Sequence, residues 1–244
     1  EFISGLIKGD CYMTVDDIRS MAWFDFGKPL ESHLMKNSTE WLALLIVSQC
    51  KTDFPQFLCN DAPDLQSRDN QIGIEVTEAI SKEDAQISGL FSNYRNGKCR
   101  TDKWRDIVEK NGGKVAFDES NITYPTITSE DEWKTICEIY GKKMGKIMSY
   151  RQKGFEKIGL IIIYSDSLIP VKKKTMEENM KYISEKFKEK YDFVFLVASE
   201  TFFEFDGYGN FTGYKRIEEM DLLKKCARLL AEQKIKIESI EQEL

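Results

Sequence analysis

Two carboxylates in one short stretch are the residues of this chain whose types and spacing best suit chemistry. Asp64 directly follows Pro63, and Glu75 lies eleven residues further on, inside the alternating run Gln71-Ile-Gly-Ile-Glu-Val-Thr-Glu78. In a strand, successive side chains point to opposite faces, so Glu75 faces away from its isoleucine and valine neighbours. A carboxylate inside an apolar strand is costly to bury unless something pairs with it. We therefore expect Asp64 and Glu75 to share a bound cation.

Two carboxylates on adjacent strands can hold Mg²⁺ or Mn²⁺ through one or two oxygens each, which leaves positions for water and a phosphate oxygen. Such an ion polarises a phosphodiester and lowers the pKa of its bound water, and a nearby lysine neutralises the developing charge. A third carboxylate, Glu40, lies at the expected start of a helix, after Asn37-Ser-Thr39. Glu40 is either a further metal ligand or a residue that stabilises the positive end of that helix. The pattern predicts metal-dependent hydrolysis of phosphodiester bonds.

Hydrophobic patterning predicts the elements that must position these residues. Residues 41–47 are apolar all round, which is typical of a buried helix. Residues 157–165 form an almost continuous apolar run rich in isoleucine, which is typical of a central strand covered on both faces. Expected helices span about 38–50, 129–153, 176–191 and 218 to the end, and expected strands about 54–59, 62–67, 71–78, 157–165, 191–198 and both sides of a turn at 206–210. These elements predict an α/β fold with a mixed central sheet flanked by helices.

The order of these elements also predicts the domain organisation. We expect a single α/β domain over residues 1–244, with its core at about 38–165. The segment at about 81–128 has too few apolar residues for a core of its own, so we interpret it as a helical insertion. A C-terminal extension of strands and helices follows at about 176–244.

Pro63-Asp64, followed by Glu75-Val76-Thr77 in a hairpin after a helix that carries Glu40, resembles the PD-(D/E)XK nuclease superfamily. The resemblance implies the restriction-endonuclease-like fold, whose core order is helix, three-stranded antiparallel meander, helix and strand. The chain from about 38 to 165 can be laid on that order. The resemblance also implies metal-dependent cleavage of nucleic acid, usually DNA, with Asp64 and Glu75 as the metal ligands.

The chain departs from the family pattern at Thr77, where the family has a lysine two residues after the glutamate. In some members of the superfamily this lysine comes from elsewhere, often the following helix, or is replaced by a polar residue. Thr77 is therefore kept as a candidate catalytic residue, and the expected helix 129–153 is the source of the missing lysine. Helical spacing places four residues on one stripe of it, with Lys143 near the edge, and we expect Lys146 to be the donor. The stripe consists of Lys142, Lys146, Tyr150 and Lys153, and Lys82 and Lys98 are further candidates.

Any nucleic-acid contact must come from a local patch, because the net charge of the chain is −6. The expected helix 129–153 carries such a patch, and contacts of this kind position phosphates without reading sequence. The patch consists of Lys142, Lys143, Lys146, Tyr150, Arg151 and Lys153, and a second cluster is Lys172–Lys174. Each cluster is alternatively an ordinary solvated surface.

Two other functions remain open from the sequence. The first is a catalytically inactive nuclease-like module that binds nucleic acid or a protein partner, which the missing lysine at Thr77 favours. The second is an unrelated α/β protein in which Asp64 ends a turn and Glu75 pairs with a lysine for structural reasons.

The remaining composition bears on the cellular compartment, on zinc binding and on membrane contact. The six cysteines are scattered and form no Cys-x-x-Cys pair, so we expect reduced thiols in a cytoplasmic protein. The single histidine excludes zinc sites that require two or more histidines. No apolar run approaches the roughly 20 residues that span a bilayer, so we expect no membrane contact.

Overall fold

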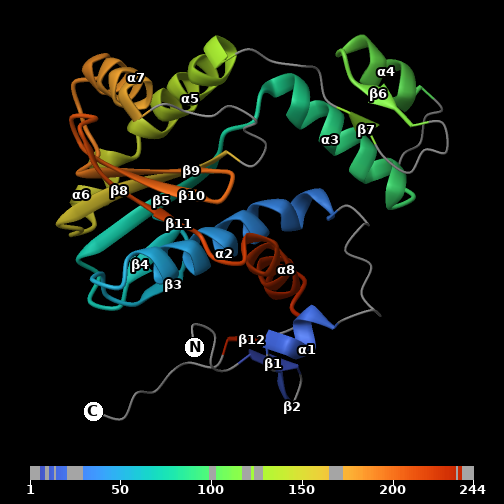
Figure 1. Ribbon diagram of the computed structural model, residues 1–244, viewed down its shortest axis with the longest axis horizontal. Coiled ribbons are helices and arrows are strands. Elements are labelled where there is room, and N and C mark those ends of the chain that lie inside the picture. The colour runs from blue at the N-terminus through green and yellow to red at the C-terminus, as the bar shows by residue number, and fades with distance from the viewer. Residues whose placement is uncertain are drawn as a thin grey trace.

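A seven-stranded mixed sheet forms the centre of the computed structural model (Figure 1). The structure describes residues 6–8, 11–13, 15–20, 30–98, 103–116, 122–123, 129–164, 173–234 and 236–237. The strand order is β11-β10-β9-β8-β5-β4-β3, in which the β5–β8 and β8–β9 pairs are parallel and the others antiparallel. The strands are β3 (Phe57–Cys59), β4 (Leu65–Ser67), β5 (Ile72–Glu78), β8 (Lys157–Tyr164), β9 (Phe193–Ala198), β10 (Thr201–Asp206) and β11 (Phe211–Arg216). The prediction of an α/β fold with a mixed sheet is confirmed.

Helices cover both faces of this sheet (Figure 1). One face packs against α2 (Ser32–Cys50) and α8 (Met220–Ala231), and the other against α5 (Ser129–Met144), α6 (Ile147–Gln152) and α7 (Lys173–Glu185). The sequence of β8 is apolar throughout because both of its faces are buried. Its residues Ile161 and Ile163 belong to the first core, whereas Leu160 and Ile162 belong to the second. Alternation along β5 likewise puts Ile74 and Val76 in the α2/α8 core and turns Glu75 towards α5 and α6.

The segment at about 81–128 contributes α3 (Lys82–Arg95), α4 (Trp104–Lys110) and a short hairpin of β6 (Lys114–Val115) and β7 (Ile122–Thr123). Residues 99–102, 117–121 and 124–128 of the expected insertion lie outside the described part of the chain. The described apolar residues form a small separate cluster. That cluster consists of Ile87, Phe91, Trp104, Val108 and Ile122. The few apolar residues of this segment therefore pack mainly with one another.

A second sheet joins described segments from the first and last parts of the sequence. Its order is β12-β1-β2, built from β1 (Leu6–Lys8), β2 (Cys11–Met13) and β12 (Lys236–Ile237), next to α1 (Val15–Arg19). The expectation of a helix from residue 218 to the end of the chain is wrong, because α8 stops at Ala231 and β12 pairs with β1. Strands of two or three residues are too short to show a hydrophobic alternation, so the sequence does not reveal this pairing.

The helix expected over 176–191 is α7, which spans Lys173–Glu185. Two other helix boundaries also differ from expectation, and both lie in elements of the site. Helix α2 begins at Ser32 rather than near residue 37, and Thr39 Oγ1 donates to the Met35 carbonyl at 3.1 Å inside the helix. This bond to the preceding turn lets a residue typical of helix starts lie in the interior. Glu40 therefore lies far from the helix end, and its alternative role as a helix-end carboxylate is removed. The predicted single helix over 129–153 is in fact α5 and α6, separated by Gly145 and Lys146, since glycine weakens helix interiors.

Four of the six cysteines are seen as free thiols, namely Cys50, Cys59, Cys137 and Cys226. The side chains of Cys11 and Cys99 lie outside what the structure describes. None of the helices in the described ranges is both long and apolar enough to cross a bilayer.

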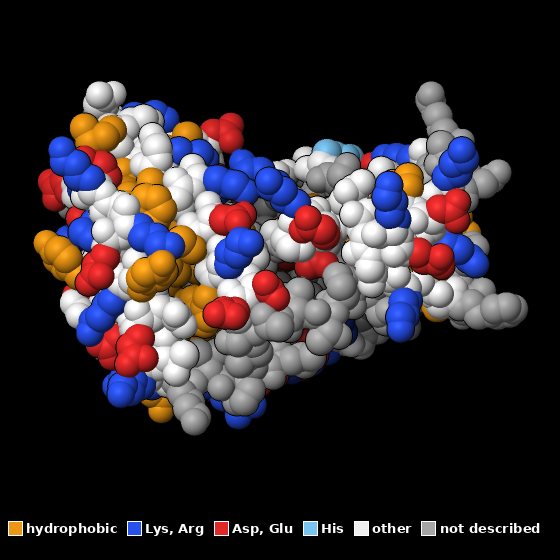
Figure 2. All heavy atoms as spheres, turned by 90° about the horizontal axis from the view of Figure 1, so that it is seen from above, with side chains coloured by type: hydrophobic (Ala, Val, Ile, Leu, Met, Phe, Trp, Pro, Cys, Tyr) orange, Lys and Arg blue, Asp and Glu red, His pale blue; other side chains and the backbone are white. Residues whose placement is uncertain are grey.

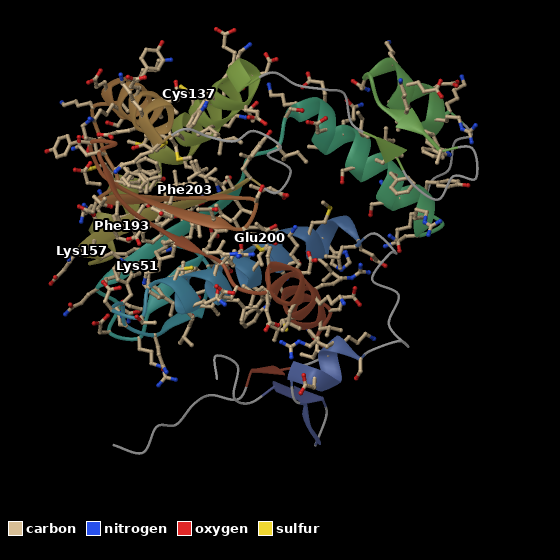
Figure 3. The ribbon with its side chains drawn as sticks, in the orientation of Figure 1. Lys51, Cys137, Lys157, Phe193, Glu200 and Phe203 are labelled. Atoms are coloured by element: carbon tan, nitrogen blue, oxygen red, sulfur yellow. The ribbon has the colours of Figure 1, made fainter. Side chains whose placement is uncertain are left out.

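We predict that Gly159→Ala destabilises the protein. Gly159 pairs with Phe193, which opens β9 beside the start of β8 where Lys157 lies (Figure 3), and a Cβ at Gly159 would lie 2.0 Å from the Phe193 ring. That ring packs on Phe54 and Phe195, with ring centroids 5.4 and 4.9 Å away, so moving it disturbs the core. We expect a loss of about 1–3 kcal/mol in the free energy of unfolding, measured by urea denaturation.

Gly89→Ala is the matched control, because Gly89 lies inside α3 and a Cβ there meets nothing within 4 Å. It should stabilise the protein by about 0.5–1 kcal/mol through helix propensity alone. Equal effects of the two substitutions would contradict the packing of Phe193 over Gly159.

Candidate active site

Glu75 is fully buried in the middle of β5, and three side chains from the α5–α6 region surround its carboxylate. Its Oε1 accepts hydrogen bonds from Lys143 Nζ at 2.6 Å and from Lys146 Nζ at 2.5 Å. Its Oε2 accepts a hydrogen bond from the hydroxyl of Tyr150. Their spacing of three and four residues puts Lys143, Lys146 and Tyr150 on one side of the α5–α6 region, and the short turn at Gly145 and Lys146 does not disturb this. The buried charge is thus fully compensated by protein groups.

These contacts fix the protonation of the cluster. Burial opposes ionisation of Glu75, but the hydrogen bonds from Lys143, Lys146 and Tyr150 outweigh it and hold the pKa of Glu75 below its usual range. Burial and the bond to Glu75 together raise the pKa of the Tyr150 hydroxyl. Near neutral pH, Glu75 is therefore ionised and Tyr150 is a hydrogen-bond donor.

Asp64 lies beside Glu75 at the start of β4. Leu65 pairs with Ile74 in the antiparallel register, so one step further along the two strands Asp64 stands opposite Glu75. Asp64 is only 2% exposed, and its Oδ2 accepts a hydrogen bond from the Val76 backbone N–H at 2.8 Å. The side chain of Asp64 thereby ties the beginning of β4 to β5.

A missing side chain on β5 makes room for this arrangement. A Cβ at Gly73 would lie 2.4 Å from Pro63 Cγ and 3.3 Å from the Phe155 ring. Glycine at this position lets the Pro63-Asp64 turn approach β5 closely. Gly73 therefore has a structural role, which is to let Asp64 lie close to β5.

Helix α2 brings a third carboxylate and a lysine to the same place. Lys36 Nζ lies 2.9 Å from Glu40 Oε1 and 3.5 Å from Asp64 Oδ1. Burial raises the pKa of Glu40, the nearby charge of Asp64 acts in the same direction, and Lys36 opposes both. Sequence reasoning missed Lys36, although its i,i+4 spacing to Glu40 on a helix was a signal that could have found it.

The structure brings together most of the predicted site residues. Asp64 and Glu40 both meet Lys36, Lys146 meets Glu75, and Asp64 bonds to the strand that carries Glu75. Thr77 is half-buried on the same strand face as Glu75. The prediction for the helix stripe needs correction, because Lys142 is exposed while Lys143 reaches Glu75.

The predicted nucleic-acid patch is also altered by the structure. Tyr150 is 1% exposed and bonded to Glu75, so it is a member of the buried cluster and cannot contact a phosphate backbone directly. Arg151 pairs with Asp192 at 2.6 Å, which ties α6 to the start of β9. Lys153 donates to the Ala62 carbonyl at 2.8 Å.

The other lysines named from sequence contribute little to a continuous basic surface. Acidic and basic side chains are interspersed over the face formed by α7, α5 and α3 (Figure 2). Lys82 is exposed at the start of α3, and Lys98 pairs with Glu31. Lys174 and Glu178 pair along α7, whereas Lys172 lies outside the described residues.

The carboxylate and carbonyl oxygens of the site are of the chemical type that binds a hard divalent cation. Lys143 Nζ lies 2.6 Å from Glu75 Oε1 and 3.3 Å from the Val76 carbonyl, so an ammonium already occupies a position lined by two oxygens. Carboxylate and carbonyl oxygens are the ligands that Mg²⁺ and Mn²⁺ prefer. In the described residues no three His, Cys, Asp or Glu side chains are grouped closely enough to form a metal cage. An ion at Glu75 would therefore have at most two carboxylate ligands, with water at its other positions, and it would have to displace an ammonium group.

Comparison of the chain with protein-family models, curated proteins and solved structures finds no match. The resemblance to the PD-(D/E)XK superfamily therefore stands on the motif residues and the order of the elements.

We predict that Tyr150→Phe lowers the free energy of unfolding by about 1.5–3 kcal/mol, because it removes a hydrogen bond to a buried charge. Tyr191→Phe is the matched control. Tyr191 is equally buried, at 1% exposure, but donates to a neutral group, the Lys143 carbonyl, at 2.9 Å. We expect a smaller loss of about 0.5–1.5 kcal/mol, measured by urea denaturation at pH 7. A Tyr191→Phe effect equal to or larger than that of Tyr150→Phe would contradict an ionised Glu75.

We also predict a pH dependence that Glu75→Gln abolishes. At neutral pH this substitution should cost about 3 kcal/mol, because it leaves the facing ammonium groups without a counter-charge. The folded-state pKa of Glu75 is lowered from its usual 4.5, so its stabilising contribution is complete above that pH and is lost as the pH falls through the folded-state value. Urea denaturation from pH 7 to pH 3 should show the advantage of the wild type shrinking below about pH 4.5. An advantage that grows on acidification would show that the pKa is raised instead.

Proposed function

We propose that this protein is a metal-dependent phosphodiester hydrolase that acts on nucleic acid, with a DNA endonuclease as the simplest form. The observation that carries the proposal is the buried Glu75, which stands opposite the buried Asp64 and is contacted by two lysines that reach it from outside the strand. Paired carboxylates with an adjacent ammonium are what a metal-assisted attack on a phosphodiester requires.

The arrangement of the elements supports the same proposal. Helix α2 comes first, the antiparallel meander β3–β4–β5 follows, and α5 and α6 lead to β8, which pairs with β5 in parallel. This is the order that the sequence resemblance implies for a restriction-endonuclease-like core. The remaining strands β9, β10 and β11 extend the sheet beyond β8.

Each residue has a distinct role in the proposal. Asp64 and Glu75 would hold Mg²⁺ or Mn²⁺, with Glu40 beside Asp64 as a further oxygen donor. The bound ion would polarise the phosphate and acidify a water molecule. Tyr150 holds the second oxygen of Glu75, which fixes the orientation of the carboxylate.

Lys146 takes the role of the family lysine, for which this chain has Thr77 instead. Its side chain is 46% exposed, whereas that of Lys143 is 22% exposed, so Lys146 is the one of the two that reaches both Glu75 and solvent. A lysine in that position can donate to a phosphate oxygen and neutralise charge that develops there. Thr77, on the same face of β5, contributes a hydroxyl.

A second function, an inactive nuclease-like module that binds nucleic acid or a protein, is favoured by one observation. Both oxygens of Glu75 are already satisfied by protein donors. An ion at Glu75 must therefore displace at least one ammonium group.

We predict that the purified protein nicks plasmid DNA in the presence of Mn²⁺ or Mg²⁺ and not in EDTA. Glu75→Ala should lower the rate at least about 100-fold, and Lys146→Ala about 10- to 100-fold, because each removes a group that acts on the transition state. Lys146→Ala should also lower the melting temperature moderately, because it removes one of the two ammonium groups on the buried Glu75 while Lys143 remains, so cleavage is compared well below that temperature.

Lys134→Ala is the matched control, since Lys134 is an exposed lysine on α5 remote in sequence from the cluster, and it should cleave normally. Metal-dependent nicking that survives Glu75→Ala would rule out the assigned site. Retained binding of nucleic acid with no nicking under either metal would establish the inactive module instead.

A further inference from the structure

We propose that Lys36 is a placeholder cation, which neutralises Glu40 and Asp64 in the metal-free protein and is released to the substrate phosphates when a divalent ion binds. This inference rests on the proposed function of the same site. It assigns a role to Lys36, a residue on α2 that belongs neither to the sequence motif nor to the lysines of the α5–α6 region.

The geometry of Lys36 differs from that of an ordinary surface lysine. Its side chain is 66% exposed, yet its ammonium lies 2.9 Å from Glu40 Oε1 and 3.5 Å from Asp64 Oδ1, whose side chains are only 13% and 4% exposed. Lys36 therefore reaches from solvent onto two nearly buried carboxylates. An approach of this kind leaves an open path to the same oxygens for a hydrated ion.

The contact is electrostatic and easily exchanged. Glu40 Oε1 is buried and accepts no hydrogen bond of good geometry, although the Lys36 ammonium lies nearby. A carboxylate oxygen in that state gains from a ligand that bonds to it directly, and a divalent cation does so. Since Lys36 is largely exposed, its ion pair contributes little stability and costs little to break.

Lys36 is the most exposed of the three lysines around the cluster. Lys143 and Lys146 contact Glu75 at 2.6 and 2.5 Å, and Lys143 also donates to the Val76 carbonyl at 3.3 Å. Lys36 has the longer contacts and the larger exposed fraction. It is therefore the first ammonium that an entering ion displaces.

Release of Lys36 has a consequence for substrate binding. A divalent ion replaces one positive charge at Glu40 and Asp64 by two, and the freed ammonium stays on α2 at the edge of the site. Both changes make the site more positive towards phosphate. Lys36 then acts as a positioning residue for nucleic acid, and metal binding precedes firm substrate binding.

The test compares Mn²⁺ affinity and nucleic-acid affinity in the same variants. Isothermal titration with Mn²⁺ alone should show that Lys36→Met binds the ion about three- to tenfold more tightly than the wild type, since the competing ammonium is gone. Lys36→Arg keeps the charge and should bind Mn²⁺ like the wild type. Lys134→Met removes an exposed lysine from α5 and controls for net charge. Its Mn²⁺ affinity should be unchanged.

The second measurement is the affinity for a fluorescent DNA duplex with Ca²⁺ in place of Mn²⁺, read by anisotropy. Lys36→Met should weaken duplex binding about threefold or more, whereas Lys134→Met should not. The two affinities thus move in opposite directions for Lys36→Met. A lysine with a merely structural role would change both in the same direction or neither.

The outcomes separate this inference from the proposed function. If the wild type binds Mn²⁺ and cleaves but Lys36→Met binds Mn²⁺ equally or more weakly, the placeholder role is overturned and the nuclease stands. If the wild type neither binds Mn²⁺ nor cleaves, both are overturned. Tighter Mn²⁺ binding by Lys36→Met, with normal binding by Lys36→Arg, supports the placeholder.

Discussion

A buried negative charge at Glu75 sets the main constraint on the rest of the site. Glu75 is 0% exposed, and an unpaired charge at such a position would be too costly for a folded protein to retain. The structure meets this cost with two ammonium groups on one oxygen and a tyrosine hydroxyl on the other. Lys143, Lys146 and Tyr150 are three and four residues apart, so the short turn between α5 and α6 leaves all three on the side that faces Glu75.

The sheet holds the other carboxylates against this centre. Asp64 is tied to β5 through the Val76 backbone, and Gly73 leaves the space that Pro63 occupies. Glu40 comes from α2, whose apolar residues pack into the core shared with α8. Each carboxylate is thus carried by an element fixed in the main cores, whereas the lysines that meet them are partly exposed. A metal ion can replace an ammonium group when the carboxylates are held rigidly and the lysine side chains can move away.

The sequence predicted the strands well, because burial on both faces of β8 and β9 leaves a continuous apolar run, and alternation along β5 identifies its polar face. Pro63, Asp64 and Glu75 were also found from sequence, since their spacing is local. The start of α2 was predicted wrongly because Asn37, Ser38 and Thr39 favour helix starts. In the structure all three lie inside the helix, and Thr39 bonds to the preceding turn. Lys36 has a local signal in its i,i+4 spacing to Glu40, and Lys143 lies at the edge of the predicted stripe, but their contacts with Asp64 and Glu75 depend on how α2 and α5 pack beside the sheet. Strands β1 and β12 are too short to show a hydrophobic pattern.

The claim that Asp64 and Glu75 hold a divalent ion is tested most directly by a crystal soaked in Mn²⁺ and measured for anomalous scattering. We predict one anomalous peak within about 2.0–2.6 Å of an oxygen of Asp64 and of an oxygen of Glu75, with at least one lysine displaced from Glu75. A crystal in saturating Mn²⁺ that shows no peak there, with Lys143 and Lys146 still on Glu75, would contradict it.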